Sequence, residues 1–252
     1  IELEDGTIVS FDKALLATGG KPNRLPVDGM DLYGVHTLRS RHDAQAIIEA
    51  AEDARKAVVV GASFIGMEVA ASLAERGIDV TVTDLEPVPF QPILGETAGS
   101  AIQKLHSDNG VRFALGSGTD HIEGDERASG VVLQDGRQLD GDFVVVGVGV
   151  HPATSFVEQL EVNEDGSLSV DESLCVAGDL YAAGDIARFP DPRSGEPVRI
   201  EHWRLANQHG QVAAAAMAGE ETTFDEIPFF WTRQFGVSYK YVGHASDWDD
   251  VI

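Results

Sequence analysis

Six consecutive residues, Gly61, Ala62, Ser63, Phe64, Ile65 and Gly66, stand between an apolar run and a helical pattern. A glycine turn at such a junction brings N–H groups of the helix N-terminus to a phosphate, and the second glycine lets helix and strand pack closely. Asp84 ends the next apolar run, where an acid binds a ribose 2′-hydroxyl and repels a 2′-phosphate. The pattern predicts a dinucleotide site that prefers NAD to NADP.

The residues on either side of this loop predict a strand, a helix and a second strand. Residues 57–60 are apolar, as in a strand buried on both faces. Apolar residues recur at helical spacing over 64–76, and the next strand covers 80–83. Ser63 replaces the usual middle glycine, but its small side chain still permits a close approach and can donate a hydrogen bond. An ordinary strand–helix turn is the alternative.

A second pattern repeats along the chain. Residues 1–19 can be laid over residues 131–149, with an Asp-Gly pair and a final glycine in both copies. Each copy predicts a hairpin followed by a short apolar strand. The repeat indicates two equivalent lobes, each with its own nucleotide loop. We therefore expect the chain to be a fragment, with the first lobe's loop lying before Ile1.

Composition narrows the class of protein. The 252 residues are 43% apolar, so a packed core is expected, and no run is long enough to span a membrane. The 42 acidic and 18 basic residues give a net charge of −24, which repels nucleic acid and anionic membranes. Acidic residues are spread throughout the chain, which suggests adaptation to high salt; an ordinary acidic protein is the alternative.

Few side chains suggest other chemistry. Cys175 is the single cysteine, so an internal disulfide or a cysteine metal cluster is excluded, and we expect a small buried residue in a cytoplasmic protein. No secretory signal opens the sequence. His202 and His209 lie two helical turns apart without a further ligand set, so no metal site is expected.

Further stretches carry distinctive motifs. They are Ala17–Pro22, Pro89-Phe90, Leu94-Gly95-Glu96, Gly147–Pro152, Tyr181–Asp185, Glu201-His202-Trp203 with Asn207–Gly210, Pro228–Trp231 and Asp249–Ile252. Together with the loop at Gly61, they resemble the two-dinucleotide flavoprotein oxidoreductases, in particular the NADH-dependent ferredoxin reductases and their apoptosis-inducing-factor-like branch. The resemblance covers nearly the whole chain.

This resemblance implies an α/β fold in which a Rossmann-like NAD-binding domain is inserted in a partial FAD-binding domain. Residues 1–37 and 151–224 would be the two parts of the FAD-binding domain, and residues 38–150 the NAD(H)-binding domain. Residues 225–252 would begin a truncated C-terminal α+β interface domain.

The resemblance also assigns site residues. Asp185 would hydrogen-bond a ribityl hydroxyl of FAD; its place after an apolar strand and a glycine agrees, although a plain turn aspartate is the alternative. Trp203 would lie beside the isoalloxazine, with the N-terminus of helix 203–218 supporting negative charge on the reduced ring. Without the family, Trp203 reads as plain core. The other implied FAD contacts are Thr18, Gly19, Arg24, Gly184 and His202.

Two residues complete the implied NAD site. Glu68 would neighbour the nicotinamide, and an acid in the first turn of the helix, complementing its dipole, is the alternative. Gly149 lies in the motif Gly147–Pro152 and would border the bound NAD.

The function implied is hydride transfer from NADH to FAD, followed by electron transfer to a ferredoxin or Rieske-type iron–sulfur protein. Two alternatives stay open. One is a disulfide or peroxide reductase of the same superfamily, which the single cysteine and the motif at Pro228 disfavour. The other is a non-catalytic, NAD-binding, redox-responsive protein. The acceptor and the oligomeric state, including a homodimer, are left open by the sequence.

Overall fold

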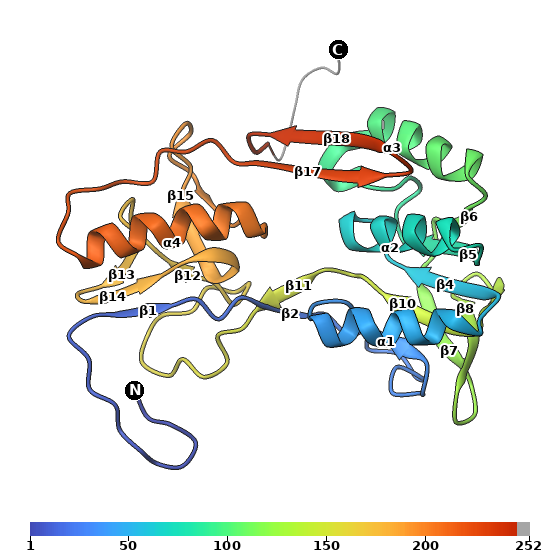
Figure 1. Cartoon of the computed structure of the whole chain (residues 1–252), viewed down its shortest axis with the longest axis horizontal. Helices are drawn as coiled ribbons and strands as arrows, with labels where there is room; N and C mark the ends of the chain where they lie inside the picture. The colour runs from blue at the N-terminus through green and yellow to red at the C-terminus, as the bar shows by residue number, and fades with distance from the viewer. Residues whose placement is uncertain (246–252) are drawn as a thin grey trace. The chain divides into compact units, whose positions relative to one another are not determined.

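The computed structural model describes residues 1–245, and the stretch at 249–252 lies outside the described residues. The chain divides into two compact units. Unit 1 contains residues 1–21, 151–230 and 241–243. Unit 2 contains residues 22–150, 231–240 and the described residues from 244. Figure 1 labels the helices and strands of both units.

Unit 2 is built on a five-stranded sheet in the order β3-β10-β4-β5-β6. All neighbouring strands are parallel. Three helices, α1, α2 and α3, connect strands of this sheet, which is the alternating pattern of an α/β fold. The bounds are β3 Val35–His36, α1 Arg41–Glu52, β4 Lys56–Val60, α2 Phe64–Glu75, β5 Asp79–Asp84, α3 Gln91–Asp108, β6 Arg112–Leu115 and β10 Phe143–Val146.

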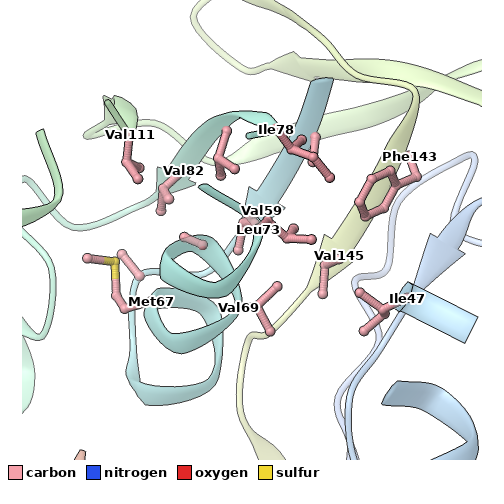
Figure 2. Close-up of a cluster of buried hydrophobic side chains, with 14 of the residues drawn as sticks. Ile47, Val59, Met67, Val69, Leu73, Ile78, Val82, Val111, Phe143 and Val145 are labelled. Atoms are coloured by element: carbon pink, nitrogen blue, oxygen red, sulfur yellow. The ribbon is translucent and has the colours of Figure 1, made fainter. Parts of the chain in front are cut away.

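The central strand β4 is buried on both faces. Val59 packs in a cluster with Met67 and Leu73 of α2, and Figure 2 shows these side chains with Val82 of β5. Val58 and Val60 point to the other face and pack in a second cluster. Each fully buried valine stabilises the fold by roughly 1.5–3 kcal/mol. The predicted strand, helix and second strand around the loop at Gly61 are therefore confirmed.

The second cluster joins this sheet to the antiparallel sheet β7-β8-β9. Its strands are β7 Thr119–Gly124, β8 Ala128–Leu133 and β9 Gln138–Asp140. Strands β8 and β9 form the hairpin predicted for the second copy of the repeat. The first copy has one isolated bridge, Glu2 to Ile8. The copies differ because Val131 and Leu133 are buried, whereas Leu3 and Ile8 are exposed.

Unit 1 contains two small sheets, β1-β14-β13 and β12-β15-β16, and the helix α4. Its core joins residues of these strands, among them Tyr181 and Phe189, to Leu205 and Ala213 of α4. The bounds are β1 Ala14–Leu16, β12 Leu168–Ser169, β13 Cys175–Ala177, β14 Leu180–Ala182, the 3₁₀ turn η1 Gly184–Ile186, β15 Ala187–Pro190, β16 Pro197–Val198 and α4 Trp203–Met217.

Two further pairs of strands complete the description. Strand β2, Gly20–Pro22, pairs with β11, Val150–Pro152. Strand β17, Phe229–Gln234, pairs with β18, Val237–Val242. In the residues that the structure describes, no helix is both long and apolar enough to cross a membrane.

Candidate functional site: the loop at Gly61 and the turn at Gly184

The turn after β4 requires glycine at Gly61. Its φ is +108°, and an added Cβ would lie 2.3 Å from the carbonyl oxygen of Gly147. The Gly61 N–H donates to the Thr83 carbonyl at 2.8 Å. The chain therefore turns tightly between the ends of β5 and β10, at the carboxyl edge of the sheet, where open α/β sheets bind ligands.

Gly66 sets how closely α2 approaches this turn. A Cβ added at Gly66 would lie 1.9 Å from the Gly61 carbonyl oxygen. The nitrogen of Gly66 in turn lies 3.2 Å from where a Cβ on Gly147 would be. Gly147 is therefore part of the turn, although the site prediction did not include it; its place as first glycine of the 147–149 motif was the available signal.

The N-terminus of α2 has the features of an anion site. Ser63 is the N-cap residue with extended backbone, and its side chain makes no capping hydrogen bond. The first turn of α2 has no acidic side chain. No acidic side chain of α2 itself therefore offsets the positive end of its dipole, which suits the pyrophosphate of a dinucleotide. The residues around Gly61 fit NAD on this ground.

Phe90 supports the loop from α3. Its backbone is left-handed, with φ of 58°, and its N–H donates to the Ala62 carbonyl at 3.0 Å. Its ring packs on Phe64 with centroids 4.8 Å apart. Phe90 was identified from the Pro89-Phe90 motif but was not predicted as a site residue, because backbone contacts leave no trace in residue type.

Asp84 is anchored to the loop. Its Oδ2 accepts from the Ala62 N–H at 2.6 Å, and its Oδ1 accepts from the Glu86 N–H at 2.9 Å. The side chain is half-buried. These two bonds fix an acid beside the glycine turn, at the position where the sequence predicts a ribose contact.

Glu68 lies in the second turn of α2 and is exposed. The alternative of a first-turn acid is therefore wrong, because the helix begins at Phe64. The Thr232 hydroxyl donates to Glu68 Oε1 at 2.5 Å. Thr232 was absent from the predicted site because it lies far along the chain on β17, and only folding brings it to α2.

Two other predicted contacts, Gly149 and Arg24, form hydrogen bonds with residues outside the loop 61–66. Gly149 has a φ of +88° and accepts from the Asn23 N–H at 2.9 Å. Arg24 donates to the Asp31 carboxylate at 2.5 Å and to the Met30 carbonyl at 2.9 Å. The Arg24 guanidinium is exposed and already has a carboxylate partner in unit 2.

In unit 1, the predicted flavin contacts follow two paired strands. Leu16 of β1 and Ala182 of β14 are parallel partners, so Thr18 and Gly184 each come two residues after this pair. The Thr18 hydroxyl donates to the Ala153 carbonyl at 2.8 Å. Asp185 is buried. The two strand ends thus bring Thr18, Gly19, Gly184 and Asp185 to one edge of the small sheet.

The turn at Gly184 is held by α4. Gly184 has a φ of +75°, and an added Cβ would approach Ala206 Cβ to 3.1 Å. The Gly184 N–H donates to His209 Nδ1 at 3.3 Å. Burial lowers the pKa of His209 from 6.5 to about 4, so the ring is neutral and can accept. His209 is therefore a structural acceptor that the sequence did not assign.

His202 and Trp203 begin α4. His202 is the N-cap, and its Nδ1 accepts from the Arg204 N–H at 3.2 Å. Burial is the main cause of its lowered pKa, while the charge of Asp185 opposes the shift. Trp203 is 65% exposed, so its reading as core is wrong. The first turn of α4 has no acid, and the positive end of its dipole, with Trp203 exposed on it, fits the flavin of FAD.

The remaining expectations concern metals and thiols. Within residues 1–245 no cluster of His, Cys, Asp and Glu side chains could hold a metal ion. Cys175 is half-buried rather than buried, because β13 lies at the edge of its sheet. Burial and nearby carboxylates raise the pKa of its thiol.

The family described as pyridine nucleotide-disulphide oxidoreductase matches residues 2–210, and the chain belongs to this family. It is a family of FAD-dependent oxidoreductases that use a nicotinamide dinucleotide.

Three comparisons place the chain among ferredoxin reductase-like members. It is 38% identical to apoptosis-inducing factor 3 of Mus musculus, over all of this chain and 42% of that protein. It is 34% identical to rhodocoxin reductase of Rhodococcus erythropolis, over all of this chain and 60% of that protein. The structure superposes on the ferredoxin reductase for the CYP199A2 system of Rhodopseudomonas palustris with a TM-score of 0.93 at 31% identity, covering 99% of this chain and 62% of that one.

These comparisons confirm the resemblance and an α/β fold shared with ferredoxin reductases. The chain spans about 40–60% of the length of the curated relatives it matches.

Proposed function

We propose that the chain is the NADH-binding part, with a portion of the FAD-binding part, of a flavoprotein reductase that delivers electrons to an iron–sulfur protein. Residues 38–150 form the NAD(H)-binding domain in this proposal. Residues 1–37 and 151–224 belong to the FAD-binding domain, and residues from 225 begin the C-terminal domain. The observation that carries the proposal is the glycine turn at Gly61 with Asp84 anchored beside it.

The proposed NADH site is in unit 2. The N-terminus of α2 receives the pyrophosphate, and the closeness of Gly66 to Gly61 supports this, since any larger side chain would push the helix away. Asp84 keeps acceptor capacity for a ribose hydroxyl and places negative charge where NADP carries its 2′-phosphate. The protein therefore prefers NADH to NADPH.

The proposed FAD contacts are in unit 1. Asp185 accepts a ribityl hydroxyl, Thr18 and Gly19 border the adenosine end, and Trp203 with the α4 N-terminus flanks the ring system. His209 holds the Gly184 turn so that Asp185 keeps its place. When bound, FAD supplies the conversion of a two-electron hydride donation into single-electron release. The protein supplies position and electrostatics, with no side-chain nucleophile.

The electron acceptor is proposed from the relatives. A ferredoxin reductase and a rhodocoxin reductase are among them. With a net charge of −24, the protein repels an acidic partner at low ionic strength, and salt relieves this repulsion. Added salt should therefore first raise the rate of electron transfer to an acidic ferredoxin.

The test is anaerobic addition of NADH to the purified protein supplied with FAD, followed by addition of oxidised ferredoxin. The expected result is loss of the visible flavin absorbance with NADH, a much smaller response to NADPH, and recovery of absorbance with ferredoxin. The Asp84→Asn variant tests whether Asp84 sets the preference for NADH over NADPH. An unchanged flavin spectrum with NADH contradicts the proposal, and a rate of ferredoxin reduction that only falls from near-zero salt contradicts the proposed acceptor.

A further inference from the structure

A chain of hydrogen bonds runs through unit 2 from a buried histidine to Glu68. His106 Nε2 lies 2.7 Å from Gln234 Oε1. Gln234 Nε2 donates to Thr232 Oγ1 at 3.1 Å, and the Thr232 hydroxyl donates to Glu68 Oε1 at 2.5 Å. These hydrogen bonds link α3, the end of β17 and α2, and all four residues belong to unit 2.

Each hydrogen bond in this series is donated in the same direction, from His106 toward Glu68. Gln234 Oε1 can only accept, so His106 Nε2 carries the proton in that bond. Gln234 donates from its other end, which leaves the Thr232 proton for the carboxylate. Such aligned bonds strengthen one another, and the last one is charge-assisted. An amide does not pass a proton along, so the chain is suited to holding Glu68 rather than to moving a proton.

The burial of these three polar side chains indicates a role beyond packing. His106, Gln234 and Thr232 are 0%, 1% and 4% exposed. Burying polar groups costs free energy unless each finds a partner, and apolar side chains would fill such a space at lower cost. The next residue, Phe235, has its ring centroid 4.9 Å from that of His106 and packs against the core cluster. This contact holds the end of β17 against α3.

The series of hydrogen bonds ends at an exposed carboxylate, that of Glu68 on the second turn of α2. An exposed glutamate ordinarily samples many rotamers, and fixing one costs entropy that a ligand would otherwise have to supply. Thr232 fixes it before any ligand arrives. The partner that a preorganised carboxylate fits is a ligand group that donates a hydrogen bond.

We propose that Thr232, Gln234 and His106 are positioning residues that preset Glu68 to accept a hydrogen bond from the carboxamide of the nicotinamide. This inference rests on the proposed function. It adds β17, which lies beyond the family match at residues 2–210, to the nicotinamide end of the site.

The test is a set of binding titrations on the whole chain with two ligands, NADH and ADP-ribose. ADP-ribose has the pyrophosphate and the adenosine of NADH but lacks nicotinamide. Thr232→Val removes the hydroxyl at constant shape, Thr232→Ser keeps it, and Glu68→Gln supplies the second side of a double-mutant cycle. Thr81→Val is the matched control, since Thr81 is also buried in unit 2 and its hydroxyl bonds with Arg112 instead.

The expected result is that Thr232→Val weakens NADH binding about tenfold and leaves ADP-ribose binding unchanged, as for loss of one bond to a charged group. Thr232→Ser and Thr81→Val should bind NADH as the wild type does. In the Glu68→Gln background, Thr232→Val should have less than about a twofold effect.

Four outcomes overturn the inference. Equal loss of NADH and ADP-ribose affinity in Thr232→Val would mean that β17 only supports the fold. The same loss with or without Glu68 would mean that Thr232 does not act through the carboxylate. Unchanged NADH binding in Thr232→Val would remove the inference while leaving the proposed function intact, whereas a wild type that binds neither ligand would remove both.

Discussion

Replacing Gly66 by alanine should push helix α2 away from the nucleotide loop. The added Cβ would lie 1.9 Å from the Gly61 carbonyl oxygen, 2.9 Å from its carbonyl carbon and 3.4 Å from Val59 Cγ1. The carbonyl cannot turn away easily, because it shares a planar peptide unit with the Ala62 N–H, which donates to Asp84 Oδ2 at 2.6 Å. The helix itself must therefore retreat.

The size of the effect follows from this distance. A carbon and a carbonyl oxygen approach to about 3.3 Å, so α2 must move back by about 1.4 Å. Met67, Val69 and Leu73 pack this helix onto the sheet, and a gap of that order forfeits a quarter to a half or more of each contact. Together with overpacking, the loss is about 3 kcal/mol in the free energy of unfolding. For a chain of this size, that is a fall of roughly 6–12 °C in melting temperature.

The assay is thermal melting with NADH titration of the same samples. Gly66→Ala should also lose at least about tenfold in NADH affinity, because the N–H groups of the α2 N-terminus move with the helix. Gly210→Ala is the matched control: it also lies within a helix, α4, but its Cβ would meet nothing within 4 Å. That change should stabilise by about 0.5–1 kcal/mol. Wild-type melting and NADH affinity in Gly66→Ala would refute the packing argument.

Three further predictions concern charge. Asp84→Asn keeps an acceptor for the Ala62 N–H but removes the charge, so the preference for NADH over NADPH should fall about tenfold in parallel titrations; an unchanged ratio would exclude Asp84 as the discriminating group. His209 has a pKa near 4 when folded against 6.5 ordinarily, so the unfolded chain binds the extra proton between these values. The free energy of unfolding should therefore fall by about 3 kcal/mol as pH drops from 6.5 to 4, and His209→Gln should flatten this profile in urea titrations; equal slopes would contradict it. Finally, with a net charge of −24, the melting temperature should rise with NaCl toward about 1 M, and a steady fall would count against salt adaptation.

The strands and helix around Gly61 were predictable because their apolar spacing has one physical interpretation. Four apolar residues in a row, Ala57 to Val60, followed at once by a glycine turn, favour a strand covered on both faces, and all four are buried. The start of α4 at residue 203 followed from the resemblance of Glu201-His202-Trp203 to the family's helix start, and the structure begins the helix there. The second-copy hairpin followed from its Asp-Gly turn.

What the sequence did not predict depends on tertiary contacts. The first copy of the repeat has the same turn, yet it forms a single bridge, since Leu3 and Ile8 have no core to enter. Phe90 bonds to the loop through its backbone N–H, which residue type does not reveal. The partner of Glu68 comes from β17, more than 150 residues along the chain.

Trp203 shows why residue type alone misleads at a site. Tryptophan is usually buried, and its position in an amphipathic helix favours the core. It is nevertheless exposed at the first residue of α4, where the helix end projects from the unit's core.

The central claim is that NADH binds at the N-terminus of α2, and amide chemical shifts during an NADH titration test it most directly. The account predicts saturable shifts that are largest for the backbone N–H groups from Ala62 to Gly66, with a second group at Asp84 and Glu68. ADP-ribose should reproduce the first group and not the shift at Glu68. Saturable shifts that leave the residues from Ala62 to Gly66 unmoved, or no saturable shifts at all, would contradict the account.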